Sequence, residues 1–246
     1  GVAPPLSVPP ALQVYARKKL GIDNAIVLPN GGPLISEEEI SQRRAKRSTE
    51  QFTVFYSGSA VYPWQGLDYF SAAIELARER APDIRFVLAV NQLSEAVPEG
   101  PNVEVFQGLN REEILDAICA SDACVALHPE YFWSPYRFHG SPMKLFEYMA
   151  CGTAVVTSNR GQMAELIEHG ENGLLCSDSQ DDILSQLIKL KDDPEFREGV
   201  GISGWNMIQQ DKRCLLYTSD AADERTRGDS GGGRNNRKKK NKRKAT

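Results

Sequence analysis

The sequence predicts an α/β domain built on a doubly wound, Rossmann-like parallel sheet. Short apolar, β-branched runs alternate with longer segments whose apolar residues recur at helical spacing, which is the pattern of strand followed by helix. The clearest unit is residues 138–157, FHGSPMKLFEYMACGTAVVT, where a turn, a short helix, a glycine stop and an inner strand follow one another. Since crossovers between parallel strands are right-handed, this order predicts one sheet of about six strands with helices on both faces.

The elements that precede the sheet form a group of their own. Residues 11–20 are expected to form a helix that ends at Gly21, and residues 25–28 a short strand before a tight turn. Residues 35–50 are charged and show no apolar face, so they predict a solvated linker or surface segment. The chain then divides into residues 1–30, a linker at 31–50, a domain at 51–210 with the strand and helix alternation typical of Rossmann domains, and a tail at 211–246.

The domain at 51–210 carries the alternation of strands and helices. The expected strands are 53–56, 85–90, 103–106, 123–127, 154–157 and 174–176. The expected helices are 66–80, 111–120, 142–151, 162–168, 181–190 and 194–210, the last interrupted near residues 199–204.

Charge is distributed unevenly along the chain. Before Cys214 there are 19 Lys and Arg against 29 Asp and Glu, whereas the remainder has 10 against 4. A basic arm of this kind often indicates nucleic-acid binding. However, the tail is glycine-rich and lacks apolar periodicity, and its start, CLLYTSDAADE, resembles translated adaptor sequence. We therefore interpret residues 211–246 as a disordered, non-native tail and predict no nucleic-acid partner.

Composition indicates a cytoplasmic protein without a metal centre. The five cysteines show no CxxC spacing and lie mostly in apolar runs, which predicts reduced, buried thiols. No run of 18 apolar residues is long enough to cross a membrane, and we expect no secretion signal.

The start of the helix in residues 138–157 is a candidate anion site. Gly140 and Ser141 form a turn, with Ser141 as N-cap and Pro142 in the first helical position. Lys144 lies in the first turn, where a cation opposes the helix dipole unless an anion lies between them. Glu147 is one turn further on, and its spacing alone favours a solvated helix carboxylate.

This stretch also resembles the nucleotide-sugar site of the group 1 (GT4-type) glycosyltransferases of GT-B fold. Glu147 matches the second glutamate of the family's Glu-x7-Glu signature, and Met149 to Gly152 match the turn that follows it. Further similarity, in order, covers residues 57–66, 106–113 and 160–175. The resemblance implies that residues 51–210 are the second domain of a GT-B fold and that residues 1–30 are a remnant of the first domain.

The resemblance also implies roles for individual residues in binding a nucleotide-sugar donor. Glu147 would hold the ribose hydroxyls of this substrate. The remaining implied positions are Gly58, Ser59 and Gln65 beside the diphosphate, and Gln107, Gly108 and Leu109 against the base.

Two departures from the family pattern change the expected site. The Arg and Lys that usually neutralise the diphosphate are replaced by Ser59 and Gln65. We expect Lys144, Arg137 and the amides of Gly140 and Ser141 to replace them. His139 stands where the first glutamate of the family is expected, and we predict it as the catalytic residue that hydrogen-bonds the transferred sugar. For Arg137 and His139, a loop side chain without a chemical role is an equal alternative.

The reaction implied by the family is transfer of a sugar from a nucleotide diphosphate to an acceptor hydroxyl, with retention of configuration and without a bound metal or other cofactor. The acceptor is not specified by these residues, and peripheral membrane contact would come through the first domain. A non-catalytic nucleotide-binding module and a GT-B-shaped sugar-nucleotide epimerase share the fold, so both alternatives stay open.

Overall fold

The computed structural model describes residues 7–8, 10–24, 26–27, 31–47, 50–130 and 142–210. The predicted tail at 211–246 lies outside these ranges. Four predicted site residues also lie outside them, namely Arg137, His139, Gly140 and Ser141.

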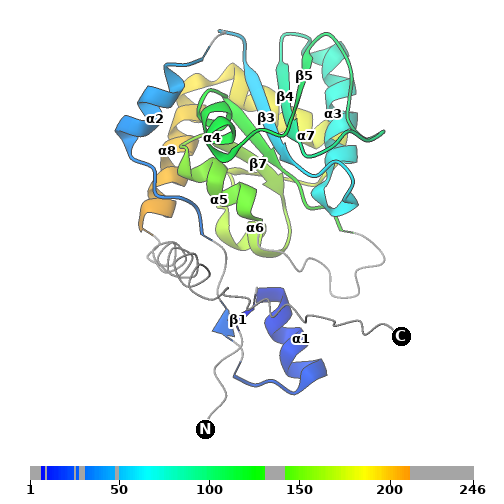
Figure 1. The fold of residues 1–246 in the computed structure, drawn as a ribbon, viewed down its shortest axis with the longest axis vertical. Helices are drawn as coiled ribbons and strands as arrows, with labels where there is room; N and C mark the ends of the chain where they lie inside the picture. The colour runs from blue at the N-terminus through cyan, green and yellow to red at the C-terminus, as the bar shows by residue number, and fades with distance from the viewer. Residues whose placement is uncertain are drawn as a thin grey trace, which may run out of the picture.

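The core of the protein is a sheet of six parallel strands in the order β5-β4-β3-β6-β7-β8 (Figure 1). The order runs outward in opposite directions from the β3–β6 pair, which is the doubly wound arrangement predicted from the sequence. The strands are β3 (Thr53–Gly58), β4 (Arg85–Val90), β5 (Val103–Gln107), β6 (Ala123–Ala126), β7 (Ala154–Ser158) and β8 (Leu174–Cys176).

Helices cover both faces of this sheet. The 3-10 helix η1 (Pro63–Gln65) and α3 (Leu67–Arg80) follow β3, and α3 lies with α7 (Gln180–Asp192) on one face. On the other face are α4 (Arg111–Cys119), α5 (Met143–Ala150) and α6 (Gly161–Leu166). The chain then continues into α8 (Pro194–Gln210), which contributes to the apolar clusters of both faces.

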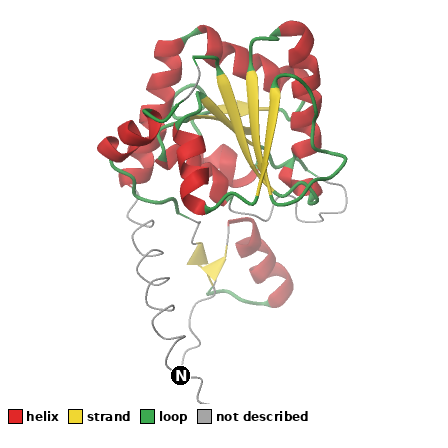
Figure 2. Cartoon of the chain, turned by 45° about the horizontal axis from the view of Figure 1, so that its top comes forward, coloured by secondary structure: helices red, strands yellow, loops and turns green. Residues whose placement is uncertain are grey.

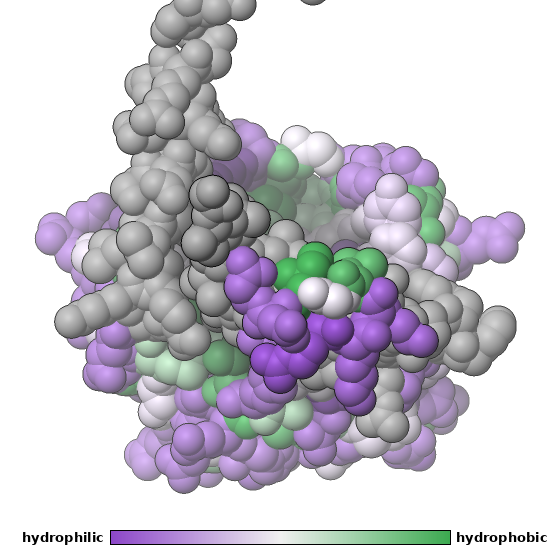
Figure 3. All heavy atoms as spheres, turned by 90° about the horizontal axis from the view of Figure 1, so that it is seen from below, coloured by the Kyte–Doolittle hydropathy of each residue, from purple (hydrophilic) through white to green (hydrophobic). Residues whose placement is uncertain are grey.

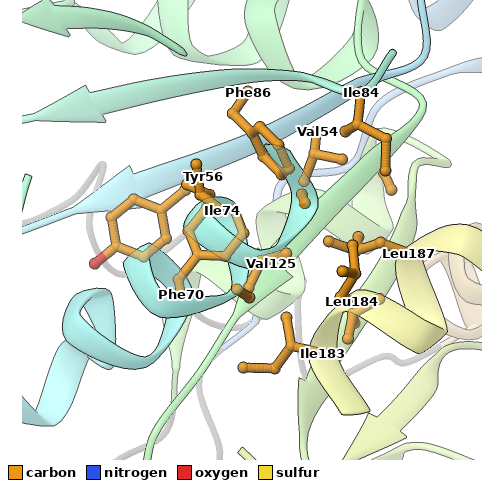
Figure 4. Close-up of a cluster of buried hydrophobic side chains, with 14 of the residues drawn as sticks. Val54, Tyr56, Phe70, Ile74, Ile84, Phe86, Val125, Ile183, Leu184 and Leu187 are labelled. Atoms are coloured by element: carbon orange, nitrogen blue, oxygen red, sulfur yellow. The ribbon is translucent and has the colours of Figure 1, made fainter. Parts of the chain in front are cut away.

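Aromatic side chains fill the core beneath α3 (Figure 4). The ring of Phe70 packs edge-on against Phe86 and tilted against Tyr56, with both pairs of centroids 5.8 Å apart. Such pairs contribute about 0.5–1.5 kcal/mol each beyond the area they bury. Tyr56 is fully buried, and its hydroxyl lies at the outer end of the cluster. The hydroxyl group of Tyr56 therefore extends from the core toward the carboxyl end of β3.

The charged segment at residues 35–50 is part of the domain surface, and the expectation that it lacks a core face was wrong. It forms α2 (Glu37–Arg44), capped by the Ser36 hydroxyl, and Ile40 is only 6% exposed. Arg43 pairs with Glu112 and Asp116 and so attaches α2 to α4. Within α2 itself Ile40 is the one buried residue, and a single buried position produces no visible helical period.

The N-terminal elements lie beyond the carboxyl ends of the strands. A two-stranded parallel pair, β1 (Ser7–Val8) and β2 (Ile26–Val27), flanks α1 (Pro10–Leu20), which contacts α6. Figure 2 shows the strands of the large sheet pointing toward the end at which α1 lies. Seen from that end, a small apolar group lies among hydrophilic side chains (Figure 3). The helix predicted at residues 11–20 and the strand predicted at residues 25–28 are thus confirmed as α1 and β2.

Helix α8 is continuous, so the predicted interruption near residues 199–204 was wrong. Its glycines permit close packing instead. A Cβ atom at Gly201 would lie 2.4 Å from the carbonyl oxygen of Gly152, and one at Gly204 would lie 3.2 Å from that of Asn172. Gly199, in contrast, is exposed and has no neighbour within 4 Å of its Cβ position.

Two alanine substitutions in α8 should therefore have opposite effects on stability. Gly199→Ala should raise the free energy of unfolding by up to about 1 kcal/mol, because alanine favours the helix more than glycine does. Gly201→Ala should lower it by about 1–3 kcal/mol, because the new methyl group overpacks the backbone of Gly152. Urea unfolding of both variants measures this. An equal gain in both would show that α8 does not approach Gly152 this closely.

Candidate functional site

A cleft of about 400 Å³ opens at the carboxyl ends of β3, β4 and β5. This is the edge at which doubly wound sheets bind ligands, because the loops there diverge around the point where the strand order changes direction. The residues that line the cleft are Ser57, Gly58, Ala89, Val90, Asn91, Gly108, Leu109, Arg111, Ile114 and Glu147.

Four of the predicted site residues line this cleft, namely Gly58, Gly108, Leu109 and Glu147. They come from the ends of two strands and from α5, so residues about 90 positions apart in the chain meet in one place. Among the residues lining the cleft, Ser59 and Gln107 do not appear. Ser59 accepts the N–H of Val61 at 3.4 Å, and Gln107 is exposed at the end of β5.

Three polar atoms converge on Gly58 at the edge of the cleft. An ideal Cβ atom on Gly58 would lie 2.8 Å from Lys144 Nζ, 2.8 Å from Tyr56 Oη and 2.9 Å from Gln65 Oε1. A side chain at this position would have to displace the ends of these three side chains, whereas glycine leaves them in place. The predicted pair of Lys144 and Gln65 is thus brought together beside the predicted Gly58.

The ammonium group of Lys144 is buried beside Gly58, and no carboxylate of the described residues pairs with it. Within the part of the chain that the structure describes, neither Lys144 Nζ nor Gln65 Oε1 has a hydrogen-bond partner. The Lys144 Nζ atom lies 4.4 Å from the centroid of the Tyr56 ring. Burial lowers the pKa of Lys144 to about 7, although Glu147 acts in the opposite direction. A desolvated cation–π contact contributes about 2 kcal/mol, less than the several kcal/mol that burial of an ammonium costs.

Glu147 faces a second cation across the cleft. Burial raises the pKa of Glu147, while Arg111 and, more weakly, Lys144 lower it. Arg111 is the first residue of α4 and lines the same cleft. Among the described ion pairs none joins Glu147 to either cation. A ligand that offers hydroxyl groups to the carboxylate and an anionic group to Lys144 would therefore satisfy groups that the protein leaves apart.

Sequence reasoning did not single out Arg111, Asn91 or Ser57 as site residues. Arg111 carried a detectable signal, because a cation in the first turn of a helix opposes the dipole just as Lys144 does. Ser57 is placed by Tyr148 of α5, whose hydroxyl oxygen accepts the Ser57 N–H at 2.8 Å and lies 3.0 Å from Ser57 Oγ. That contact fixes the end of β3 against the helix that carries Lys144 and Glu147. It joins residues 91 positions apart, so no local pattern shows it.

The start of α5 differs slightly from the prediction. Pro142, expected as the first helical residue, is the N-cap, and the helix begins at Met143. Lys144 is still in the first turn, and the N-cap residue makes no side-chain hydrogen bond.

The histidines and cysteines in the described ranges fit structural roles. Burial and the charge of Lys144 lower the pKa of His128 to about 3, so its ring is neutral. His169 Nδ1 accepts the N–H of Leu175 at 3.0 Å. The four described cysteines are free and buried, as expected. No group of three or more His, Cys, Asp or Glu that could hold a metal ion occurs in the ranges the structure describes.

Comparison with known families identifies the chain. A family model described as "Glycosyl transferases group 1" matches residues 51–193. The chain belongs to this glycosyltransferase family. A search of curated proteins gave no match. None of the described helices is long and apolar enough to cross a membrane.

Solved structures share the fold of this group 1 glycosyltransferase chain at low sequence identity. HepE of Anabaena, in complex with UDP and glucose, is 19% identical with a TM-score of 0.62 over 83% of this chain and 57% of that chain. Sucrose-phosphate synthase of Thermosynechococcus elongatus is 16% identical with a TM-score of 0.64 over 90% and 58%. The C-terminal domain of LpcC of Francisella tularensis is 16% identical with a TM-score of 0.51 over 73% and 94%. The chain thus spans somewhat over half the length of the first two.

Removing the buried charge should stabilise the protein in a pH-dependent manner. Because the pKa of Lys144 is lowered to about 7, the unfolded chain binds a proton between about pH 7 and pH 10 that the folded chain lacks. The cost of this charge is therefore largest below pH 7 and declines as the pH rises. Lys144→Met should raise the free energy of unfolding by more than about 1 kcal/mol at pH 6 and by less at pH 9.

Urea unfolding of the wild type and Lys144→Met at both pH values measures this difference. The matched control is Lys189→Met. Lys189 Nζ also lies 4.4 Å from the centroid of an aromatic ring, that of Phe196, but Lys189 is exposed to solvent. A Lys144→Met variant that is less stable than the wild type at pH 6 would show that other groups of the protein already stabilise the charge of the Lys144 ammonium.

Proposed function

We propose that residues 51–210 are the donor-binding domain of a glycosyltransferase that transfers a sugar from a nucleotide diphosphate to an acceptor hydroxyl with retention. The observation that carries this proposal is the buried ammonium of Lys144 beside Gly58 and Gln65, at the ligand-binding edge of a group 1 glycosyltransferase domain. A buried cation without a counter-ion is costly, and an anion placed against it removes that cost.

The diphosphate of the donor fits this position. The first turn of α5 places the positive end of the helix dipole at the same edge as Lys144. Gln65 adds a neutral amide, and its oxygen and nitrogen are interchangeable by a rotation of the amide group. Turned so that its NH₂ faces a phosphate, Gln65 donates where the family usually has a cation.

The nucleoside fits the rest of the cleft. Glu147 accepts hydrogen bonds from the two ribose hydroxyls, while Gly108 and Leu109 lie at the wall where the base is expected. Arg111 lies on the same wall and balances the carboxylate. HepE, which has a similar fold, was crystallised with UDP and with UDP-glucose, and this supports a nucleotide sugar as the donor.

The chemical step requires stabilisation of the departing diphosphate. The acceptor oxygen forms its bond to the anomeric carbon from the face that the diphosphate leaves, the bond from that carbon to the β-phosphate oxygen breaks, and the hydroxyl proton passes to the departing diphosphate, on which negative charge accumulates. Lys144 and the positive end of the α5 dipole stabilise this charge without a metal ion in our proposal. The acceptor would be held mainly by a preceding domain, of which residues 1–30 are the remnant. Their position beyond the carboxyl ends of the strands agrees with this.

The role of Glu147 can be tested with an analogue of UDP that lacks the two ribose hydroxyls. Calorimetry in the presence of EDTA should show UDP binding to the wild type. Glu147→Gln should weaken UDP binding about tenfold, because a hydrogen bond to a charged acceptor contributes about 1.5–3 kcal/mol. For 2′,3′-dideoxy-UDP, the wild type and Glu147→Gln should have equal affinities. The matched control is Glu165→Gln, which changes an exposed glutamate on α6.

Two outcomes would contradict the proposal. Binding of UDP that disappears with EDTA would show a metal-dependent site. An equal loss of affinity for UDP and dideoxy-UDP in Glu147→Gln would show that Glu147 does not contact the ribose hydroxyls.

A further inference from the structure

An exposed aromatic pair lies on the loop that connects β3 to α3. Tyr62 is 49% exposed and Trp64 is 41% exposed. Their rings are stacked, with centroids 4.6 Å apart and an interplanar angle of 16°. We call these two residues the aromatic platform. Val61, next to them, is 40% exposed.

The aromatic platform is held in place and is continuous with the cleft. The N–H of Gln65 donates to the carbonyl of Tyr62 at 2.9 Å, and the side chain of Gln65 reaches Gly58. Ala60, just before the platform, donates its N–H to Asn91 Oδ1 at 3.4 Å and accepts from Ser94 Oγ at 2.7 Å. Asn91 itself lines the cleft. A ligand on the platform would therefore lie beside the diphosphate position.

The size and charge of this region limit what it can bind. A stable protein interface buries about 800 Å² on each partner, whereas an aromatic residue buries at most about 250 Å². The large exposed apolar residues of the two loops that form the region, residues 59–66 and 91–98, are Val61, Tyr62, Trp64 and Leu93, which is 60% exposed. Four residues exposed by this much offer at most about 600 Å², which is too small for a protein partner. The two loops contain one charged residue, Glu95, and no cation. They therefore offer no attraction for an anionic lipid surface or a nucleic acid.

A neutral sugar ring is a ligand that fits the small size and the lack of cations of this region. One face of a pyranose consists of C–H bonds and packs against an aromatic ring, while its hydroxyl groups extend outward to polar neighbours. Ser59 and Asn91 are such neighbours at the cleft side of the platform. We propose that Tyr62 and Trp64 bind a neutral sugar unit of the acceptor and direct its hydroxyl toward the cleft. This inference rests on the proposed function, since it assumes a reaction at the neighbouring diphosphate position.

Nuclear magnetic resonance on the ¹⁵N-labelled chain tests the platform directly. The indole N–H signal of Trp64, assigned with Trp64→Phe, is followed during titration with cellotetraose, maltotetraose and α-1,6-mannotetraose. We expect at least one of these to shift the Trp64 signal and to leave Trp205 unchanged, because the indole N–H of Trp205 donates to the carbonyl of Ile35 and its ring packs against an apolar cluster away from the platform. Tyr62→Ala should weaken this binding at least fivefold. Ile202→Ala, which truncates an equally exposed apolar residue on α8, should not.

Each other outcome overturns the inference. No shift at Trp64 with any of the three oligosaccharides, or equal shifts at Trp64 and Trp205, excludes a specific platform. A shift caused by UDP-glucose and not by UDP would assign the platform to the donor sugar instead of the acceptor. UDP binding is measured separately on the same sample. Normal UDP binding with no sugar response therefore refutes the platform alone, and absent UDP binding refutes the proposed function.

Discussion

The convergence of Lys144, Tyr56 and Gln65 on Gly58 is the constraint on which the rest of the site depends. Glycine at the end of β3 permits it, since a side chain there would displace three polar atoms from their positions. The convergence also requires that α5 begin directly beside that strand end, and the bond between Tyr148 and Ser57 holds the two together. The protein thus keeps a cation in a desolvated position that is favourable only when an anion is bound.

The surroundings of this position divide into regions of different chemistry. On one side Glu147 and Arg111 face each other across a cleft with apolar walls, which suits a nucleoside. On the other side the loop after β3 carries aromatic rings and no charge, which suits a neutral sugar. The anion position lies between them. A nucleotide sugar and an acceptor sugar would therefore be arranged along one edge of the sheet, with the bond to be broken near Lys144.

Local sequence patterns predicted most of the fold and part of the site. All six strands of the large sheet were predicted within two residues. Five of them are buried and leave apolar runs, whereas the edge strand β5 is largely exposed and alternates in polarity (VEVFQ). Helix α2 was missed because a single buried isoleucine leaves no period, and α8 was divided because close-packed glycines look like breaks. Lys144 and Glu147 were predicted as site residues through helix position and resemblance. Arg111, in contrast, was not predicted as a site residue. It acts on the charge of Glu147 across the cleft, and no local sequence pattern encodes that proximity.

Proton uptake on binding tests the central claim that Lys144 is the diphosphate cation. UDP-glucose is a suitable ligand because both of its phosphates are esterified and do not titrate near neutral pH. At pH 8 the lysine is mostly neutral in the free protein, since its pKa is about 7, and a bound anion raises that pKa. Calorimetry in HEPES and in Tris should then show uptake of close to one proton per UDP-glucose bound by the wild type. Binding without proton uptake, or the same uptake in Lys144→Gln, would contradict the account.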